Sequence, residues 1–172
     1  MGRSLGTISQ ASIWVNDIFC RGINEFTAPT FEAKTDEGEE LALFGTPEYL
    51  TGMEPLEIEL KGKNYDPDFA AAAADLISIQ QIIALENVSL NQGGIVTAHK
   101  QRKHTMRGQF KESSSGELAG KERAEFEYAF SCSYYKQEYE GRIIVEFDVF
   151  NNIYITDGVD RLAQMRVNLG LT

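Results

Sequence analysis

The chain has 172 residues, with 16 basic and 26 acidic side chains that give a formal charge of −10. This length is typical of one domain, so we expect residues 1–172 to form a single domain with a continuous core. The hydrophobic share of 42% excludes a disordered chain. The excess of acidic residues argues against tight nucleic-acid binding, because phosphates would be repelled.

The sequence predicts neither a secretory signal nor a membrane-spanning segment. The first fifteen residues contain one basic residue, Arg3, and no apolar run long enough for a secretory signal. The most apolar stretch, residues 69–74, is far shorter than the roughly 20 residues that span a bilayer. Cys20 and Cys132 lack the close spacing of metal ligands or a redox pair, so we predict reduced thiols in the core.

The N-terminal part predicts extended structure. In residues 12–21 two short runs flank Asn16 and Asp17, which tolerate the positive φ of a two-residue hairpin turn. A second extended segment is predicted over residues 26–34. Residues 35–40 hold four carboxylates and are predicted to form a solvated loop.

Residues 41–53 combine turn residues with apolar ones. Gly45, Pro47 and Gly52 favour a loop, and the apolar side chains between them favour a covered position. We therefore expect a partner surface to cover this loop.

A strand and a helix follow. Residues 56–61 alternate apolar and charged side chains, which predicts a strand with one buried face. Asp66, Pro67 and Asp68 provide a capping side chain, a proline for the first helical position and an acid for the first turn. With the alanine-rich residues 69–74 they predict a helix that can lie close to a sheet.

The rest of the chain is rich in strand patterns. Strands are predicted over residues 78–89, over residues 96–111 with a polar interruption, and over residues 124–134 after a loop at 113–116. The aromatic residues that alternate in residues 124–134 are predicted to lie in the core.

The C-terminal part predicts a hairpin and a helix. Glu140 and Gly141 are expected to turn the chain into a strand at residues 143–149. Beyond Asp157 and Gly158, five positions between residues 159 and 169 are spaced as one stripe of a helix, which predicts a short helix that Gly170 ends. The stripe consists of Val159, Leu162, Ala163, Arg166 and Leu169.

Candidate catalytic chemistry is sparse. His99 and His104 stand among lysines and an arginine, whose charge opposes both an imidazolium and a bound cation. No sequence motif of a common hydrolase or nucleotide-binding enzyme occurs. We therefore predict no enzymatic activity, no metal site and no cofactor.

Two pairs of glutamates and one basic cluster are the charged features of interest. Each glutamate pair has the i, i+2 spacing of a single strand face, which is compatible with an acid/base pair and more simply explained by a solvated face. The pairs are Glu57 with Glu59 and Glu125 with Glu127. The basic cluster is either a polar loop or a site that docks onto an acidic surface of another subunit. It consists of Lys100, Arg102, Lys103 and Arg107.

Long strands, one helix and the lack of an active-site motif are typical of a chain that assembles with further copies of itself. A strand edge left open in one subunit can pair with the next, and a head-to-tail contact that closes by rotation gives a ring.

Residues 157–171 carry a specific sequence pattern. They read D-G-V-D-R-L-A-Q-M-R-V-N-L-G-L. This segment resembles the C-terminal end of the major tail tube proteins of contractile-tailed temperate phages and R-type pyocins. That end has the pattern N-G-V-D-x-L-x-x-x-R-x-x-L/I-G-L. In this chain Asp157 stands in place of the usual Asn. Further agreement lies in Arg107-Gly108, Lys111-Glu112 and residues 120–128, 133–136, 141–142 and 146–148.

The resemblance implies a mainly β fold of two packed antiparallel sheets with a flanking helix and a long excursion loop. It also implies a structural virion protein whose hexameric rings stack into the inner tube of a contractile tail, the conduit for DNA ejection. Expected partners are further copies of the chain, the tail sheath, the baseplate, the tail terminator and a tape measure protein in the lumen. DNA would pass without specific binding, and no membrane binding is expected. The protein would be assembled in the host cytoplasm and located in the virion.

Site residues follow from this resemblance as expectations. An acidic lumen would repel DNA phosphates, so the glutamates are expected on lumen-facing or interface-facing strand surfaces; they are Glu57, Glu59, Glu125 and Glu127. The covered loop is expected to contact the neighbouring ring or subunit, through Phe44, Tyr49, Leu50 and Met53. The basic cluster is expected at a contact between subunits.

Three alternatives remain at this point. The same fold could form the tube of a DNA-free device, either an R-type tailocin or a type VI secretion tube. A monomeric binding module would need a surface aromatic cluster, for which Tyr134, Tyr135 and Tyr139 are the candidates. An enzyme would show turnover that depends on a carboxylate.

Overall fold

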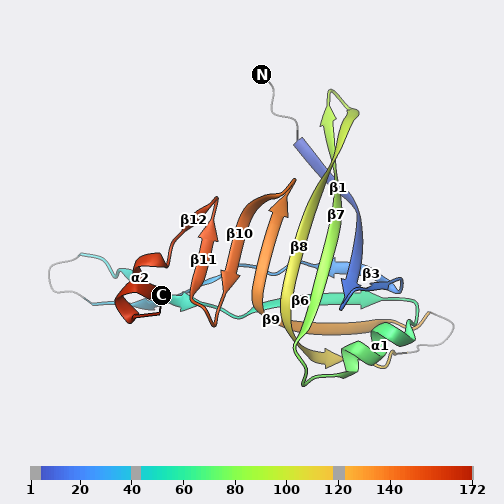
Figure 1. The fold of residues 1–172 in the computed structure, drawn as a ribbon, viewed down its shortest axis with the longest axis horizontal. Coiled ribbons are helices and arrows are strands. Elements are labelled where there is room, and N and C mark those ends of the chain that lie inside the picture. The colour runs from blue at the N-terminus through green and yellow to red at the C-terminus, as the bar shows by residue number, and fades with distance from the viewer. Residues whose placement is uncertain (1–4, 40–43, 118–122, 172) are drawn as a thin grey trace.

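The computed structural model describes residues 5–39, 44–117 and 123–171, and antiparallel strands dominate it (Figure 1). The expected class, mainly β with packed antiparallel sheets and short helices, is confirmed. The elements are β1 (Leu5–Val15), β2 (Ile18–Cys20), β3 (Ile23–Thr27), β4 (Ala33–Glu37), β5 (Glu48–Met53), β6 (Leu56–Gly62), α1 (Pro67–Ala74), β7 (Gln80–Gln92), β8 (Ile95–Ser113), β9 (Phe126–Tyr139), β10 (Arg142–Asp148), β11 (Ile153–Thr156), β12 (Val159–Asp160) and α2 (Ala163–Leu169).

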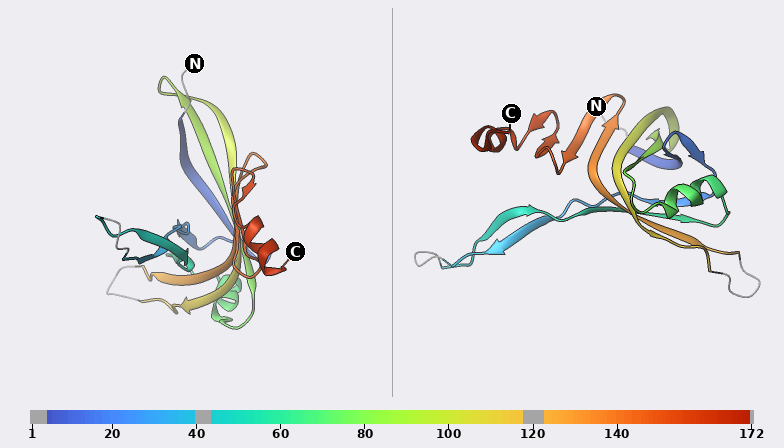
Figure 2. Two further views of the ribbon diagram at one scale, coloured as in Figure 1. Left: turned by 90° about the vertical axis from the view of Figure 1, so that its left-hand side faces the viewer. Right: turned by 60° about the horizontal axis from the view of Figure 1, so that its bottom comes forward.

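Ten of the described strands form one hydrogen-bonded sheet that folds into two layers. Its main path runs β12-β11-β10-β9-β8-β7-β1-β2, which we call the wide layer. Residues 134–139 of β9 pair with β10, whereas residues 126–132 pair with β6, which in turn pairs with β3. We call β3, β6 and the adjoining parts of β8 and β9 the narrow layer. Figure 2 shows the two layers meeting at a steep angle.

The bend between the layers coincides with irregular pairing of β8 and β9. The register shifts between Arg107 and Gly108 and again between Phe110 and Glu112. A Cβ atom on Gly108 would lie 1.8 Å from the carbonyl oxygen of Ser131, so the backbones approach closely only because this residue is glycine.

The core fills the angle between the layers. The alternation predicted for residues 56–61 is confirmed in β6, where Leu56, Ile58 and Leu60 are buried. The predicted aromatic core is confirmed for Phe126, Tyr128 and Phe130, and Phe130 packs edge-on against Phe110 at a ring-centroid distance of 5.0 Å. It is wrong for Tyr134, which is only half-buried.

Both cysteines are buried free thiols, as predicted. Burial raises the pKa of Cys20 to about 11 and that of Cys132 to about 12, so both thiols stay protonated at neutral pH.

The predicted helix is confirmed as α1. The Asp66 side chain accepts hydrogen bonds from the backbone N–H groups of Asp68 and Phe69, and Pro67 is the first helical residue. Phe69 packs edge-on against Tyr128 at 4.7 Å, which fixes α1 to the narrow layer.

Both predicted hairpin turns are confirmed. Asn16 and Asp17 have φ values of 47° and 68°, and Val15 pairs with Ile18 across them. The turn at residues 140–141 joins β9 to β10 with positive φ at both positions.

The C-terminal helix forms but starts later than predicted. Residues 157–158 make a positive-φ turn, after which Val159 and Asp160 pair back onto β11 as β12. The helix therefore begins at Ala163, and it ends as predicted at Gly170, whose φ is 67°. Neither helix in the described part of the chain is long and apolar enough to cross a membrane.

Four loop or strand predictions are wrong. The polar interruption in residues 96–111 does not exist, since β8 is continuous over 19 residues. The extended segment over residues 26–34 contains only the end of β3 and the start of β4, and residues 28–32 between them are not strand. The loops predicted for residues 35–40 and 41–53 contain the paired strands β4 and β5, although residues 40–43 lie outside the described part. All five residues of β4 are exposed, so no alternation could mark it.

Candidate assembly surfaces

The glutamate face is the exposed side of the narrow layer. Glu57, Glu59 and Glu127 project from β6 and β9 away from the core, and all three are exposed. Glu125 is exposed just before β9, where it forms a β-bridge with Glu117. The structure therefore brings together on one side the glutamates that the sequence singled out.

Lysines on the same face pair with three of these glutamates. Lys61 lies 2.8 Å from Glu127 and Lys63 lies 3.0 Å from Glu125. Lys111 pairs with Glu57. A hydrogen bond from Lys61 to Glu127 raises the pKa of the lysine, which keeps it cationic. The face is thus a mixed surface with an acidic excess, and sequence spacing alone did not show its lysines.

The two-stranded arm of β4 and β5 projects from the body of the molecule (Figure 2, right). Phe44 and Leu50 are largely exposed there, at 109% and 69% of their reference areas, and Tyr49 is 46% exposed. Met53 lies at the base of the arm and packs against the core. Three of the four predicted contact residues are therefore presented outward, and the fourth anchors the arm.

The basic cluster lies on a strand and is divided between its two faces. Lys100 and Arg102 lie on one side of β8, where they pair with Glu140 and Glu86. Alternation places Lys103 and Arg107 on the other side. The interpretation of this cluster as a polar loop is wrong, because the chain there is continuous strand.

Lys103 and Arg107, the outward pair of the cluster, lie next to Glu138 and Tyr134 of β9. Lys103 is opposite Glu138 in the strand register. The guanidinium carbon of Arg107 lies 4.5 Å from the centre of the Tyr134 ring, within the range of a cation–π contact. These two cations stay at the surface of the wide layer.

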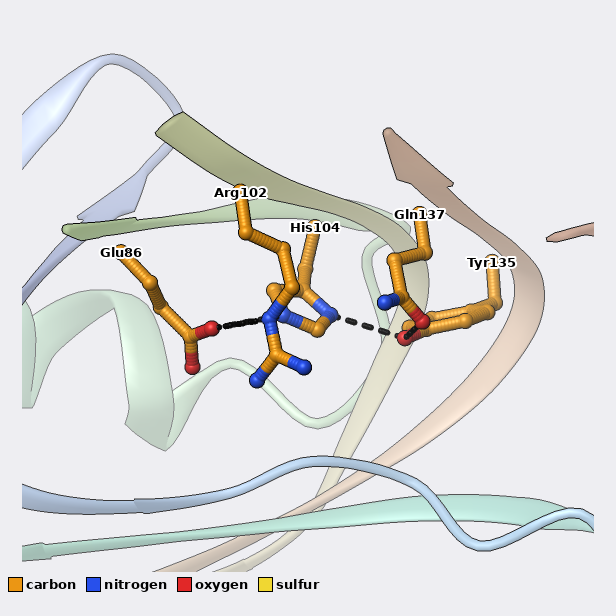
Figure 3. Close-up of polar contacts among 5 residues, drawn as sticks. All are labelled: Glu86, Arg102, His104, Tyr135 and Gln137. Carbon is orange, nitrogen blue, oxygen red and sulfur yellow. Dashed lines mark hydrogen bonds and ion pairs between the residues drawn. The ribbon is translucent and has the colours of Figure 1, made fainter. Parts of the chain in front are cut away.

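A buried polar network, which the sequence did not reveal, joins β7, β8 and β9 (Figure 3). His104 lies 3.2 Å through Nε2 from the Glu86 carboxylate and 2.8 Å through Nδ1 from the Tyr135 hydroxyl. Tyr135 is also within 3.4 Å of the Gln137 side-chain oxygen. Arg102 donates a further hydrogen bond to Glu86.

The network compensates for burying a carboxylate. Burial alone raises the pKa of Glu86, but hydrogen bonds from His104 and Arg102 outweigh it and hold the pKa at about 2. Burial raises the pKa of Tyr135, so its hydroxyl stays protonated. Each buried side-chain polar atom in the described residues has a partner, which indicates a structural role for the network.

Tyr134 and Tyr135 do not form the surface aromatic cluster that a binding module would need. Tyr135 is buried, whereas its neighbour Tyr134 is half-buried and turns to the opposite face, where its hydroxyl donates to Glu146. Among the described residues, no group of three or more His, Cys, Asp or Glu is arranged to hold a metal ion.

The two ends of the wide layer carry open strand edges. β1 pairs with β7 over most of its length, but β2 covers only Ile13–Val15, so residues 6–12 have one strand neighbour in the described part of the chain. At the other end β12 covers only Ile155 and Thr156 of β11. Open edges of this kind pair readily with another chain.

A bent β-sheet with open ends, a projecting arm and exposed apolar side chains is typical of a protein that assembles through its strand edges. Residues 6–170 match the family described as phage tail tube protein FII. The chain belongs to this family of structural tail tube proteins, and the resemblance carried by residues 157–171 is confirmed.

Individual relatives agree with this assignment. The chain is similar to the tail tube protein of Escherichia phage P2, with 41% identity over 66 residues. That match spans 38% of this chain and 38% of the phage P2 protein.

Two solved structures share the fold at 10% sequence identity. One is the sheath/tube terminator of an extracellular contractile injection system, PVC, in the extended state, with a TM-score of 0.56 over 75% of this chain and 93% of that chain. The other is the sheath-tube complex of the same system, with a TM-score of 0.56 over 75% and 88%.

Proposed function

We propose that this chain is the major subunit of the inner tube of a contractile tail. Six copies close into a ring, and rings stack around a lumen through which DNA passes into the host. The observation that carries the proposal is the family match over residues 6–170 together with open edges at both ends of the wide layer. Residues 1–172 act as one tail tube domain with a structural role and no enzymatic one.

Pooling strands between copies is a physical requirement of this function. A barrel of about eight strands is filled by its own side chains, so one subunit cannot enclose a channel for a DNA duplex. Joining the β1 end of one copy to the β12 end of the next gives both open edges a partner. Because the two ends differ, the contact is head-to-tail and closes into a ring by rotation.

The glutamate face is proposed to line the lumen or a subunit interface. Its support is the common orientation of Glu57, Glu59 and Glu127 and the acidic excess, which disfavours adhesion of DNA. Glu59→Cys tests the lumen position. In assembled tubes a small maleimide should label this cysteine, whereas a maleimide on a large protein carrier should not. Equal labelling by both would place the face on the outside.

The arm is proposed to contact the neighbouring ring. Phe44 and Leu50 expose apolar area that water disfavours, and the arm extends them beyond the body. Removing residues 35–52 should leave a folded protein that forms no tubes, with Lys34→Glu as a control that keeps the arm. Tubes of normal length without the arm would refute this role.

The outward cations Lys103 and Arg107 are proposed to dock onto an acidic surface of another subunit. Lys103→Glu should weaken assembly most at low salt, because exposed charge pairs are screened as salt increases. Assembly that is equally strong at low salt would contradict this contact.

Further partners follow from a tube role. The sheath would surround the tube, the baseplate and the tail terminator would bound it, and a tape measure protein would occupy the lumen during assembly. The chain would be assembled in the host cytoplasm and would reside in the virion tail.

A DNA-free contractile device is the second candidate. The fold shared with the extracellular contractile injection system supports it, whereas the 41% identity with the phage P2 protein favours a phage. Particles purified from the source cell distinguish the two, because a phage tail is attached to a DNA-filled capsid and a tailocin is not.

The tube proposal itself is tested by mass. Light scattering after size exclusion, over a series of protein concentrations, should show a species of six subunits, and negative staining should show rings or tubes with a central hole. A protein that stays monomeric at every concentration would favour the binding-module alternative.

A further inference from the structure

The C-terminal helix α2 is held by few contacts of its own chain. None of its seven residues is buried, and Met165, Val167 and Leu169 are 39%, 56% and 60% exposed. A helix this short is not stable by itself in water. Its side-chain anchor is Arg166, which donates to the carbonyl of Asn152 at 2.8 Å and pairs with Asp160. The apolar surface of α2 therefore needs another partner.

The sequence of α2 places its apolar residues in pairs four positions apart. Met165 lies one helical turn from Leu169, and Ala163 lies one turn from Val167, so two sides of the helix are apolar. Gln164 and Asn168 form a polar stripe, joined by a 3.0 Å hydrogen bond. The polar stripe gives a matched position for a control substitution.

The position of α2 in the fold indicates which surface covers it. α2 follows β12, the terminal strand at one end of the wide layer (Figure 1). In the strand order, β2 is the terminal strand at the other end. Ile18 and Phe19 on β2 are each 42% exposed. Both ends of the wide layer thus expose apolar side chains next to an open strand edge.

The two ends also differ in charge. Arg161 is exposed between β12 and α2, where its Nε donates to the Thr156 hydroxyl. At the β2 end, the exposed side chains of Asp17 in the hairpin turn and Asp68 in α1 outnumber the exposed cation Arg21, which follows β2. Opposite charges favour contact between unlike ends over contact between like ends.

We propose that α2 of one copy packs against β2 of the next copy in the ring, with Met165 and Leu169, which share one side of the helix, over Ile18 and Phe19. This inference rests on the proposed ring and adds to it the contact that fixes the order of neighbours. The occupant is a second copy because the two surfaces lie at opposite ends of the same hydrogen-bonded layer. A contact between unlike ends is head-to-tail, whereas contact between two α2 helices would stop at a dimer.

Cysteine cross-linking tests the neighbour directly. The double variant Phe19→Cys with Leu169→Cys, oxidised after assembly, should give a ladder of covalent multimers that ends at the ring size. Each single variant should remain uncrosslinked, since Cys20 and Cys132 are buried. Covalent dimers of the Leu169→Cys variant alone would overturn the proposal, and so would assembled rings of the double variant that give no ladder.

Charge substitutions test the energetic role of α2. Met165→Glu and Leu169→Glu, one turn apart on the same side of α2, should each raise the protein concentration at half-assembly about tenfold or more, while Gln164→Glu should change it less than about twofold. Thermal unfolding should be unchanged in all three, because no residue of α2 is buried.

The outcomes separate this inference from the proposed function. If the glutamate variants form rings at the wild-type concentration, the α2 contact is wrong and the tube proposal stands. If the wild type stays monomeric over the same series, the tube proposal is contradicted and the α2 contact falls with it.

Discussion

Replacing Glu86 by Gln is expected to lower the free energy of unfolding by about 3 kcal/mol at pH 6. In the folded chain, burial of the carboxyl group is outweighed by hydrogen bonds from His104 and Arg102, which move its pKa from 4.5 to about 2. At 1.36 kcal/mol for each pH unit, this difference corresponds to about 3 kcal/mol. Gln resembles the protonated carboxyl in shape, so the substitution removes the charge-dependent part of the stabilisation.

The stabilisation by Glu86 depends on pH. A carboxyl whose pKa is lower in the folded state stabilises the fold above its unfolded pKa, and that stabilisation is lost as the pH falls through the folded pKa. The difference between wild type and Glu86→Gln should therefore stay near its full value down to about pH 5 and shrink between about pH 4.5 and pH 2.

Urea unfolding provides the assay. The single tryptophan, Trp14, packs against Phe19 at a ring-centroid distance of 5.1 Å and reports unfolding by fluorescence. The protein is diluted until light scattering shows monomers, so that assembly does not contribute to the unfolding signal. Glu57→Gln is the control, since its exposed pair with Lys111 is worth at most about 1 kcal/mol. A Glu86→Gln effect no larger than the control, or one that does not change between pH 5 and pH 2, would refute the reasoning.

Three further substitutions test the packing, each by the midpoint of urea unfolding. Gly108→Ala should destabilise by about 2 kcal/mol or more, because its Cβ would lie 1.8 Å from a backbone oxygen; an unchanged midpoint would contradict the close approach. Phe130→Ala empties a fully buried site and should cost about 3–5 kcal/mol; a cost below about 1 kcal/mol would mean that the core lies elsewhere. Asp66→Ala removes two capping hydrogen bonds and should cost about 1 kcal/mol, whereas Asp66→Asn should retain most of that stability.

The elements that could be predicted from sequence are those whose signal is local. The capping residues of α1 and the positive-φ turn at Asn16 depend only on neighbouring residues, and both were predicted correctly. β6 was predictable because one of its faces is buried, which forces alternation.

Other features depend on contacts that local patterns do not contain. β4 and β5 have no buried face, so the arm gave no alternation and was predicted as loop. The polar side chains in β8 were interpreted as an interruption, although they continue the strand. Glu86 lies 16 positions before its partner Arg102, and Glu140 lies 40 positions after its partner Lys100, beyond any local window.

Some features of the candidate surfaces could likewise be predicted from local spacing, and others depend on contacts between strands. The common face of Glu57 and Glu59 follows from their spacing, and the structure agrees. The lysines that pair with the glutamates come from other strands, so the partial neutralisation of the face could not be predicted. The resemblance in residues 157–171 identified the family although α2 buries none of its residues in its own chain.

A reconstruction of the assembled particle by cryo-electron microscopy is the most direct test of the central claim. We expect six copies in a ring, with the β1 end of each wide layer joined to the β12 end of the next and α2 covering β2 of its neighbour. A ring in which both ends of the wide layer remain open to solvent would contradict it.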